Sequence, residues 1–318
     1  MKTFYFICLT LAVLLLCVND VVSQNPISVS YEKSVNNYVF TANNQSYYPY
    51  TVIVIFKDLE GTSNMSEDTP YVYTLMHGQR TIFTLRPYKD GDWIQFSYSY
   101  RTLKGDWLAD SDSSFVYLSP LASGKVVHVA PMGTLRHFLH EGEERDEFTG
   151  LSFETVAGDT VYAMRGGFVC EVEDNNSSLG RTVDDGKTLF SRNENFVVIC
   201  HKDGSMASYK LFKDGGIFVK SGDKVYAGQP LGIVGGENYQ GGSHLRLQLE
   251  GCFDDDSAKI VDGKNYRLFV PVIAVSDTET CKPVQRTEFM ALHPQKVIMQ
   301  EMSKKERKQY LKQFSQKK

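Results

Sequence analysis

The stretch VKSGDKVYAGQPLG, residues 219–232, decides the fold. Its glycines separate short runs rich in valine, tyrosine and leucine, and glycine readily adopts the left-handed backbone that turns need. Similar runs lie on both sides of it: DTVYAMRGGFVCEVE (159–173), NFVVICHKDG (195–204) and GGSHLRLQLEG (241–251). Repeated β runs separated by turns predict an all-β domain, which we expect over residues 148–285. No GxGxxG motif is present, so a nucleotide-binding fold is not supported.

Residues from about Phe148 to Glu250 resemble the lysostaphin-type (LytM-like) zinc peptidase family. The resemblance rests on GDTVYAMRGGFV (158–169), VVICHKDG (197–204), the VKSGDKVYAGQPLG stretch and HLRLQ (244–248). It covers about a third of the chain. It implies a β-sheet domain of the duplicated hybrid motif type, with a groove that in active members crosses peptidoglycan peptides.

The residues at the family's catalytic positions depart from its pattern. In active members the first motif, HxGxD, supplies a histidine and an aspartate to one zinc ion, and the second histidine of HxH completes the set. Those positions hold Phe148, Ser152 and Arg246 here, and the two further catalytic histidines fall on Leu211 and His244. Zinc needs about three nitrogen, sulfur or carboxylate ligands. The resemblance therefore implies a pseudo-metallopeptidase without a metal cofactor.

The remaining polar residues of the motifs suggest a ligand groove made of Tyr209, His244 and Arg246. Arg246 has two open roles: a bidentate grip on a ligand carboxylate, or an ion pair with an acidic neighbour in the vacated metal site. For His244 the alternatives are ligand binding and a structural hydrogen bond.

Two other functions remain open at this stage. A rebuilt zinc site would make the chain an active endopeptidase, with His137, His140, His201 and His244 as candidate ligands, together with Glu144 or Asp146. The other alternative is a structural module of two β domains, since the first half of the chain shows no catalytic constellation.

The chain outside this region divides into four further segments. Residues 24–120 contain about seven short strands with regular turns, which predicts an antiparallel β-sandwich, immunoglobulin-like in outline. Residues 121–147 are interpreted as a connector. Residues 286–318 are rich in helix formers, and residues 303–318 hold seven basic residues and one acidic residue. We expect a short basic C-terminal helix there.

The first 23 residues have the pattern of a secretory signal peptide cut after Ser23, with an apolar run at residues 4–18. An uncleaved anchor and a lipoprotein attached through Cys17 are the alternatives. We expect export to the periplasm or outside a bacterium, and no membrane span in the mature chain. A formal charge of −4 argues against a nucleic-acid partner. The expected partner is peptidoglycan or an envelope protein.

Four cysteines follow the signal peptide: Cys170, Cys200, Cys252 and Cys281. An exported chain permits disulfides, and four cysteines allow three pairings. Cys170 and Cys200 lie in strand-like runs that could be neighbours, and Cys252 and Cys281 flank one segment. We expect bonds 170–200 and 252–281, with four buried free thiols as the alternative.

Overall fold

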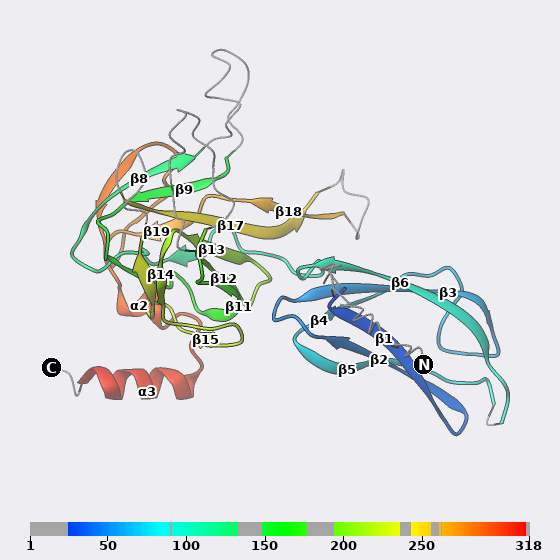
Figure 1. Ribbon diagram of the computed structural model, residues 1–318. Helices are drawn as coiled ribbons and strands as arrows, with labels where there is room; N and C mark the ends of the chain where they lie inside the picture. The colour runs from blue at the N-terminus through cyan, green and yellow to red at the C-terminus, as the bar shows by residue number, and fades with distance from the viewer. Residues whose placement is uncertain are drawn as a thin grey trace, which may run out of the picture.

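The computed structural model describes residues 25–89, 91–132, 148–176, 194–235, 243–255, 261 and 263–315. Within these ranges the chain forms two β-rich lobes that lie side by side (Figure 1). We call strands β1 to β6 the N-terminal lobe and everything from β7 onward the C-terminal lobe. The expected all-β architecture is confirmed, with two short helices at the C-terminal end.

The N-terminal lobe is built from two three-stranded antiparallel sheets. The strands are β1 (Ile27–Ser34), β2 (Asn37–Asn44), β3 (Tyr50–Glu60), β4 (Tyr71–Leu75), β5 (Gly78–Leu85) and β6 (Gln95–Lys104). One sheet has the order β1-β2-β5 and the other β4-β3-β6. Both sheets contribute to one apolar core, in which the rings of Phe40 on β2 and Phe56 on β3 meet edge to face at 5.5 Å. Such aromatic contacts fix the two sheets against each other.

The seventh strand expected in this lobe belongs to the C-terminal lobe. β7 (Val116–Tyr117) pairs in parallel with β19 (Val272–Ala274). Tyr117 and Leu121 are fully buried in the core of the C-terminal lobe. A boundary at residue 120 and a seven-stranded immunoglobulin-like outline are therefore wrong, because the apolar side chains of this segment find their partners in the other lobe.

One nine-stranded sheet organises the C-terminal lobe. Its order is β15-β11-β12-β13-β17-β9-β8-β21, with β18 paired to the far end of β17. The strands are β8 (Val126–Met132), β9 (Gly150–Glu154), β11 (Gly167–Glu173), β12 (Phe196–Cys200), β13 (Met206–Lys210), β15 (Lys224–Val225), β17 (His244–Asp254), β18 (Lys264–Leu268) and β21 (Thr287–Met290). All pairings within it are antiparallel.

Two small sheets complete the lobe. The first has the order β10-β16-β14 and is formed by β10 (Thr160–Tyr162), β14 (Phe212–Ile217) and β16 (Pro230–Val234). The second has the order β20-β19-β7 and adds β20 (Thr280–Cys281) to the pair of β7 and β19. Their inner side chains join those of the large sheet in one apolar core. In the 219–232 stretch, Gly222 and Gly228 have φ values of +92° and +80°, so the expected left-handed turns are present.

The segments expected as a connector and a tail extend the large sheet instead. β8 pairs with β9 on one side and with β21 on the other. Residues 126–132 are therefore not a linker, and the segment from residue 286 begins as a strand. The expected C-terminal helix follows as α2 (Gln295–Ile298) and α3 (Lys304–Ser315). Among the described residues, no helix is long and apolar enough to span a membrane.

One of the two expected disulfides is present. Cys170 and Cys200 are bonded, on the neighbouring strands β11 and β12. The expected bond between Cys252 and Cys281 is wrong, because Cys252 lies in the nine-stranded sheet whereas Cys281 lies in the small sheet with β19. Burial raises the pKa of the Cys252 thiol to about 11, so this side chain stays protonated in the core.

Polar contacts join the two lobes. The hydroxyl of Tyr48 donates a hydrogen bond of 2.6 Å to Glu171, and the hydroxyl of Tyr266 accepts one of 2.8 Å from the Asp106 amide. At Gly222 a Cβ atom would lie 2.6 Å from the ring of Tyr47. Only glycine permits this approach, since its left-handed backbone and its missing side chain are both required.

Candidate functional site

Three residues at positions that the resemblance assigns to the family's site, Ser152, His244 and Arg246, share one face of the nine-stranded sheet. Along β17, Leu245, Leu247 and Leu249 are buried in the core, so His244 and Arg246 point to the opposite face. The pairing register places Arg246 opposite Ser152 of β9 on one side and opposite Lys210 of β13 on the other. The sheet therefore brings two of the three substituted ligand positions, Ser152 and Arg246, directly side by side.

An ion-pair cluster occupies this position. Nη1 of Arg246 lies 3.0 Å from Oε1 of Glu194, and Nζ of Lys210 lies 3.9 Å from Oε2 of the same carboxylate. The side chains of Arg246 and Glu194 are 18% and 14% exposed. The pairing of Arg246 with an acidic neighbour, one of its two expected roles, is therefore what the structure shows. The sequence motifs do not single out Glu194, which lies two residues before the FVVIC strand.

The prediction that Tyr209 lines the ligand groove is wrong. It is fully buried among the apolar core residues, and its hydroxyl accepts a hydrogen bond of 2.9 Å from the Met164 amide. Successive strand residues face opposite sides, so Lys210 rather than Tyr209 shares the face of Arg246. Leu211 is also fully buried, at a φ of +79°, and Phe148 packs partly buried against the same core.

Of the histidines proposed for a rebuilt zinc site, the two that the structure describes, His201 and His244, are not brought together. His244 begins β17, opposite Glu154 of β9. His201 follows β12 at the other end of β13, so the five-residue length of β13, roughly 17 Å, lies between them. His137, His140, Glu144 and Asp146 lie outside the described residues.

Comparison with known proteins identifies the domain. The family described as peptidase family M23 matches residues 147–252. Residues 147–252 form an M23 domain of the LytM type. The match includes Phe148, Ser152 and Arg246, together with strands β9 to β16 and most of β17.

Solved structures give weaker likenesses. A variant of the EnpA catalytic domain, a prophage-encoded M23 protein from Enterococcus faecalis, is 25% identical, with 42% of this chain and 85% of that chain covered and a TM-score of 0.30. The lysostaphin catalytic domain from Staphylococcus simulans is also 25% identical, over 35% and 71% of the chains, with a TM-score of 0.25. Csd3 from Helicobacter pylori is 12% identical over 92% and 79%, with a TM-score of 0.30. A comparison with curated proteins finds no match. The domain assignment therefore rests on the family match.

The zinc ion of active M23 domains does not fit the residues present. Ser152 offers a neutral hydroxyl, and Arg246 brings a fixed positive charge within reach of the position where a cation would lie. Phe148 has no donor atom. Within the described ranges, no group of three histidine, cysteine, aspartate or glutamate side chains could hold a metal ion.

A second polar centre lies at the other end of β13, beside the start of β11, around Arg165. This guanidinium is 3% exposed and forms ion pairs of 2.9 Å with Asp203 and 2.6 Å with Glu301. It also lies 3.6 Å over the ring of Phe115. Burial opposes ionisation of Asp203, yet the Arg165 charge and the Ser205 hydrogen bonds hold the pKa of that carboxyl at about 2. No sequence motif indicated this cluster.

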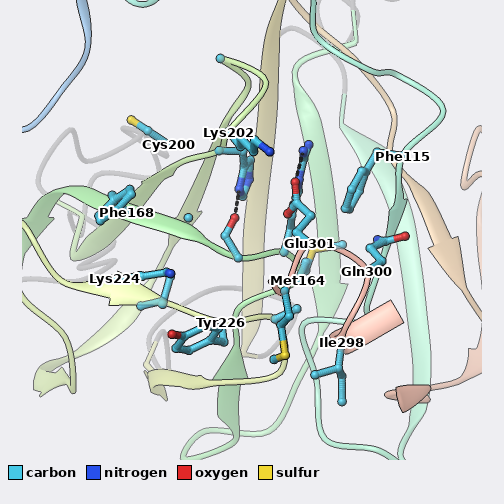
Figure 2. A pocket seen from close by; sticks show the side chains of 18 of the residues that line it. Phe115, Met164, Phe168, Cys200, Lys202, Lys224, Tyr226, Ile298, Gln300 and Glu301 are labelled. Atoms are coloured by element: carbon cyan, nitrogen blue, oxygen red, sulfur yellow. Dashed lines mark hydrogen bonds and ion pairs between the residues drawn. The ribbon is translucent and has the colours of Figure 1, made fainter. Parts of the chain in front are cut away.

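A pocket of about 360 Å³ lies beside Arg165 (Figure 2). Its walls come from the β10–β11 connection and the start of β11, from the β12–β13 turn, from residues 224–227 and from the α2–α3 segment, with Met76 and Pro49 contributed by the N-terminal lobe. Figure 2 shows Phe168, Tyr226 and Ile298 around the space. The pocket does not include Ser152, His244 or Arg246, so it is distinct from the substituted catalytic positions.

Proposed function

We propose that this chain is an exported protein of the bacterial cell envelope whose M23 domain is catalytically inactive. It binds peptidoglycan, or a cell-wall hydrolase that it regulates, through the sheet face that carries His244, Arg246 and Lys210. The observation that carries the proposal is the Arg246–Glu194 ion pair beside Ser152, where the family pattern places zinc ligands. The signal-like N-terminus supports the location.

The first prediction concerns metal content. The full mature chain, purified without chelators, is expected to contain close to no zinc and to leave peptidoglycan uncut, because too few ligands remain. Elemental mass spectrometry measures the zinc content, and the release of soluble muropeptides measures the cleavage of peptidoglycan. The triple variant Phe148→His/Ser152→Asp/Arg246→His restores the family's ligand types and should take up about one zinc per chain.

The contrary result is equally specific. About one zinc per wild-type chain, lost in His244→Ala and accompanied by chelator-sensitive cleavage, would establish a rebuilt site and an active endopeptidase. The same zinc content in His244→Ala would point to ligands in the residues around 133–147.

The second prediction concerns binding by the inactive face. Wild-type protein is expected to sediment with purified peptidoglycan sacculi, and His244→Ala/Lys210→Ala to bind at least about ten-fold more weakly, since both side chains lie on the proposed contact face. Lys57→Ala, at an exposed site in the N-terminal lobe, is the matched control and should bind like wild type. Equal binding by all three proteins would remove this face from the proposal.

A further inference from the structure

Two ion-pair clusters lie at the pocket beside Arg165, and Lys202 is a further charged residue of its lining. Arg165 pairs with Glu301 through two hydrogen bonds, of 3.1 Å and 2.6 Å. Lys224 lies 2.6 Å from Glu306, which also accepts a hydrogen bond of 3.0 Å from the Tyr226 hydroxyl. What remains of the wall is mainly apolar, including Met164, Phe168, Val225, Ile298 and Met302. Such a wall favours a neutral, apolar ligand over an ion.

One buried polar atom of the wall has no partner. His201 lines the pocket and is 6% exposed, and its Nε2 atom makes no hydrogen bond. Its Nδ1 atom lies 2.9 Å from the carbonyl oxygen of Gly166. A carbonyl only accepts, so Nδ1 carries the hydrogen and Nε2 is an acceptor. Burial, and then the charge of Arg165, lower the pKa of His201 to about 4, which keeps the ring neutral.

An acceptor buried without a partner is costly, and in native proteins it calls for an explanation. Nε2 is closed to water in this structure, so a donor reaches it only if a lining side chain moves. The wall contains Met164 and Met302, whose unbranched side chains adapt at little cost and make favourable contacts with aromatic rings. The rings of Phe168 and Tyr226 provide further aromatic surface.

We propose that this pocket binds a small neutral aromatic alcohol, whose ring contacts the methionine and aromatic walls and whose hydroxyl donates a hydrogen bond to Nε2 of His201. A volume of about 360 Å³ accommodates a substituted phenol. The site is separate from the face assigned to peptidoglycan, so the two proposals stand or fall independently.

The test compares 4-propylphenol with its methyl ether, which has the same ring but no donor. Calorimetric titration of the full mature chain is expected to show saturable binding of the phenol, about ten-fold tighter than that of the ether. The unprotonated ring-nitrogen resonance of His201 should shift on addition of the phenol alone. His201→Asn should bind the two compounds equally, because it lacks the Nε2 acceptor.

A second variant separates loss of the pocket from loss of the fold. Ile298→Trp fills the space from α2 and should abolish binding of both compounds, whereas Val284→Trp, at an exposed site outside the pocket, should leave the ten-fold preference intact. Absence of saturable binding to wild type, an ether that binds as tightly as the phenol, or unchanged binding by Ile298→Trp would each overturn the proposal.

Discussion

Replacing Arg165 by methionine is expected to lower the free energy of unfolding by about 3–5 kcal/mol, because it leaves two carboxylates without their buried partner. Asp203 and Glu301 are 15% and 26% exposed, so water replaces the lost guanidinium only in part. The hydrogen bonds from Arg165 to Tyr117 and Ser205 are lost as well. Urea unfolding, followed by far-ultraviolet circular dichroism, measures the change.

The same substitution should release the C-terminal segment. Glu301 lies between α2 and α3, and its two hydrogen bonds to Arg165 connect this segment to the M23 sheet. Amide hydrogen exchange over residues 301–312 should therefore accelerate more in Arg165→Met than exchange in β3 of the N-terminal lobe. Equal acceleration in both places would show that Arg165 supports the whole fold without a specific role in holding the segment.

Two controls define what Arg165 contributes. Arg165→Lys keeps the charge but loses the planar fork that reaches two carboxylates at once, so its loss of stability should be intermediate. Arg286→Met breaks an ion pair with Glu154 at the surface, where the two side chains are 74% and 57% exposed. This substitution should lower the free energy of unfolding by less than about 1 kcal/mol. If Arg165→Met lowers the free energy of unfolding by less than about 1 kcal/mol, the expected order of the three variants is contradicted.

The local features of the fold could be predicted from the sequence. Alternating apolar residues and glycine turns identify most strands, and the left-handed backbone of Gly222 and Gly228 follows from residue type alone. The Cys170–Cys200 bond was within reach because its two cysteines lie in adjacent strand-like runs, on β11 and β12.

Features that depend on pairing register or on long-range contacts could not be predicted. The motif that contains Tyr209 lies near the family site and so predicts a groove residue, but a shift of one residue along a strand reverses the face on which a side chain lies. The parallel pairing of Val116 with Val272 joins segments far apart in the sequence. Arg165 and Glu301 are 136 residues apart and belong to no common motif.

The candidate site also combines features that the sequence predicts with features that depend on long-range contacts. The resemblance assigns Ser152 and Arg246 to two zinc-ligand positions of the family, and the structure places these two residues opposite each other. The identity of the replacing partner, Glu194, depends on how the start of β12 approaches β17, and no residue pattern encodes that approach. The ion pair of Arg246 with Glu194 thus depends on the assembled sheet, whereas the residue types at the motif positions can be read from the chain itself.

Acidification from about pH 6.5 to about pH 4 is expected to destabilise the folded chain by about 3 kcal/mol through His201 alone. The folded protein keeps this ring neutral down to a pKa of about 4, because burial opposes its charge and Arg165 adds repulsion. The unfolded chain binds the proton near pH 6.5. Between the two values the unfolded state holds more protons, so stability falls as pH falls.

The charged groups around His201 change their protonation outside the range from about pH 4 to about pH 6.5. The contribution of His201 to the pH dependence of stability can therefore be separated from theirs. Asp203 has a pKa of about 2, so its contribution is present above about pH 4 and disappears only below it. Arg165 keeps its charge throughout, and Tyr117, whose pKa burial raises above its usual alkaline value, stays neutral between about pH 4 and about pH 7. Burial also lowers the pKa of His293, which adds a smaller slope of the same sign.

Urea midpoints measured between pH 7 and pH 4 test the assignment. His201→Asn keeps an amide donor near the Gly166 carbonyl but has no group that titrates in this range, so most of the slope should disappear. His128→Asn, at an exposed histidine beside Glu288, is the matched control and should retain the slope of wild type. A wild-type slope that persists in His201→Asn would assign the acid sensitivity to another group and show that the His201 ring is not held neutral by its burial.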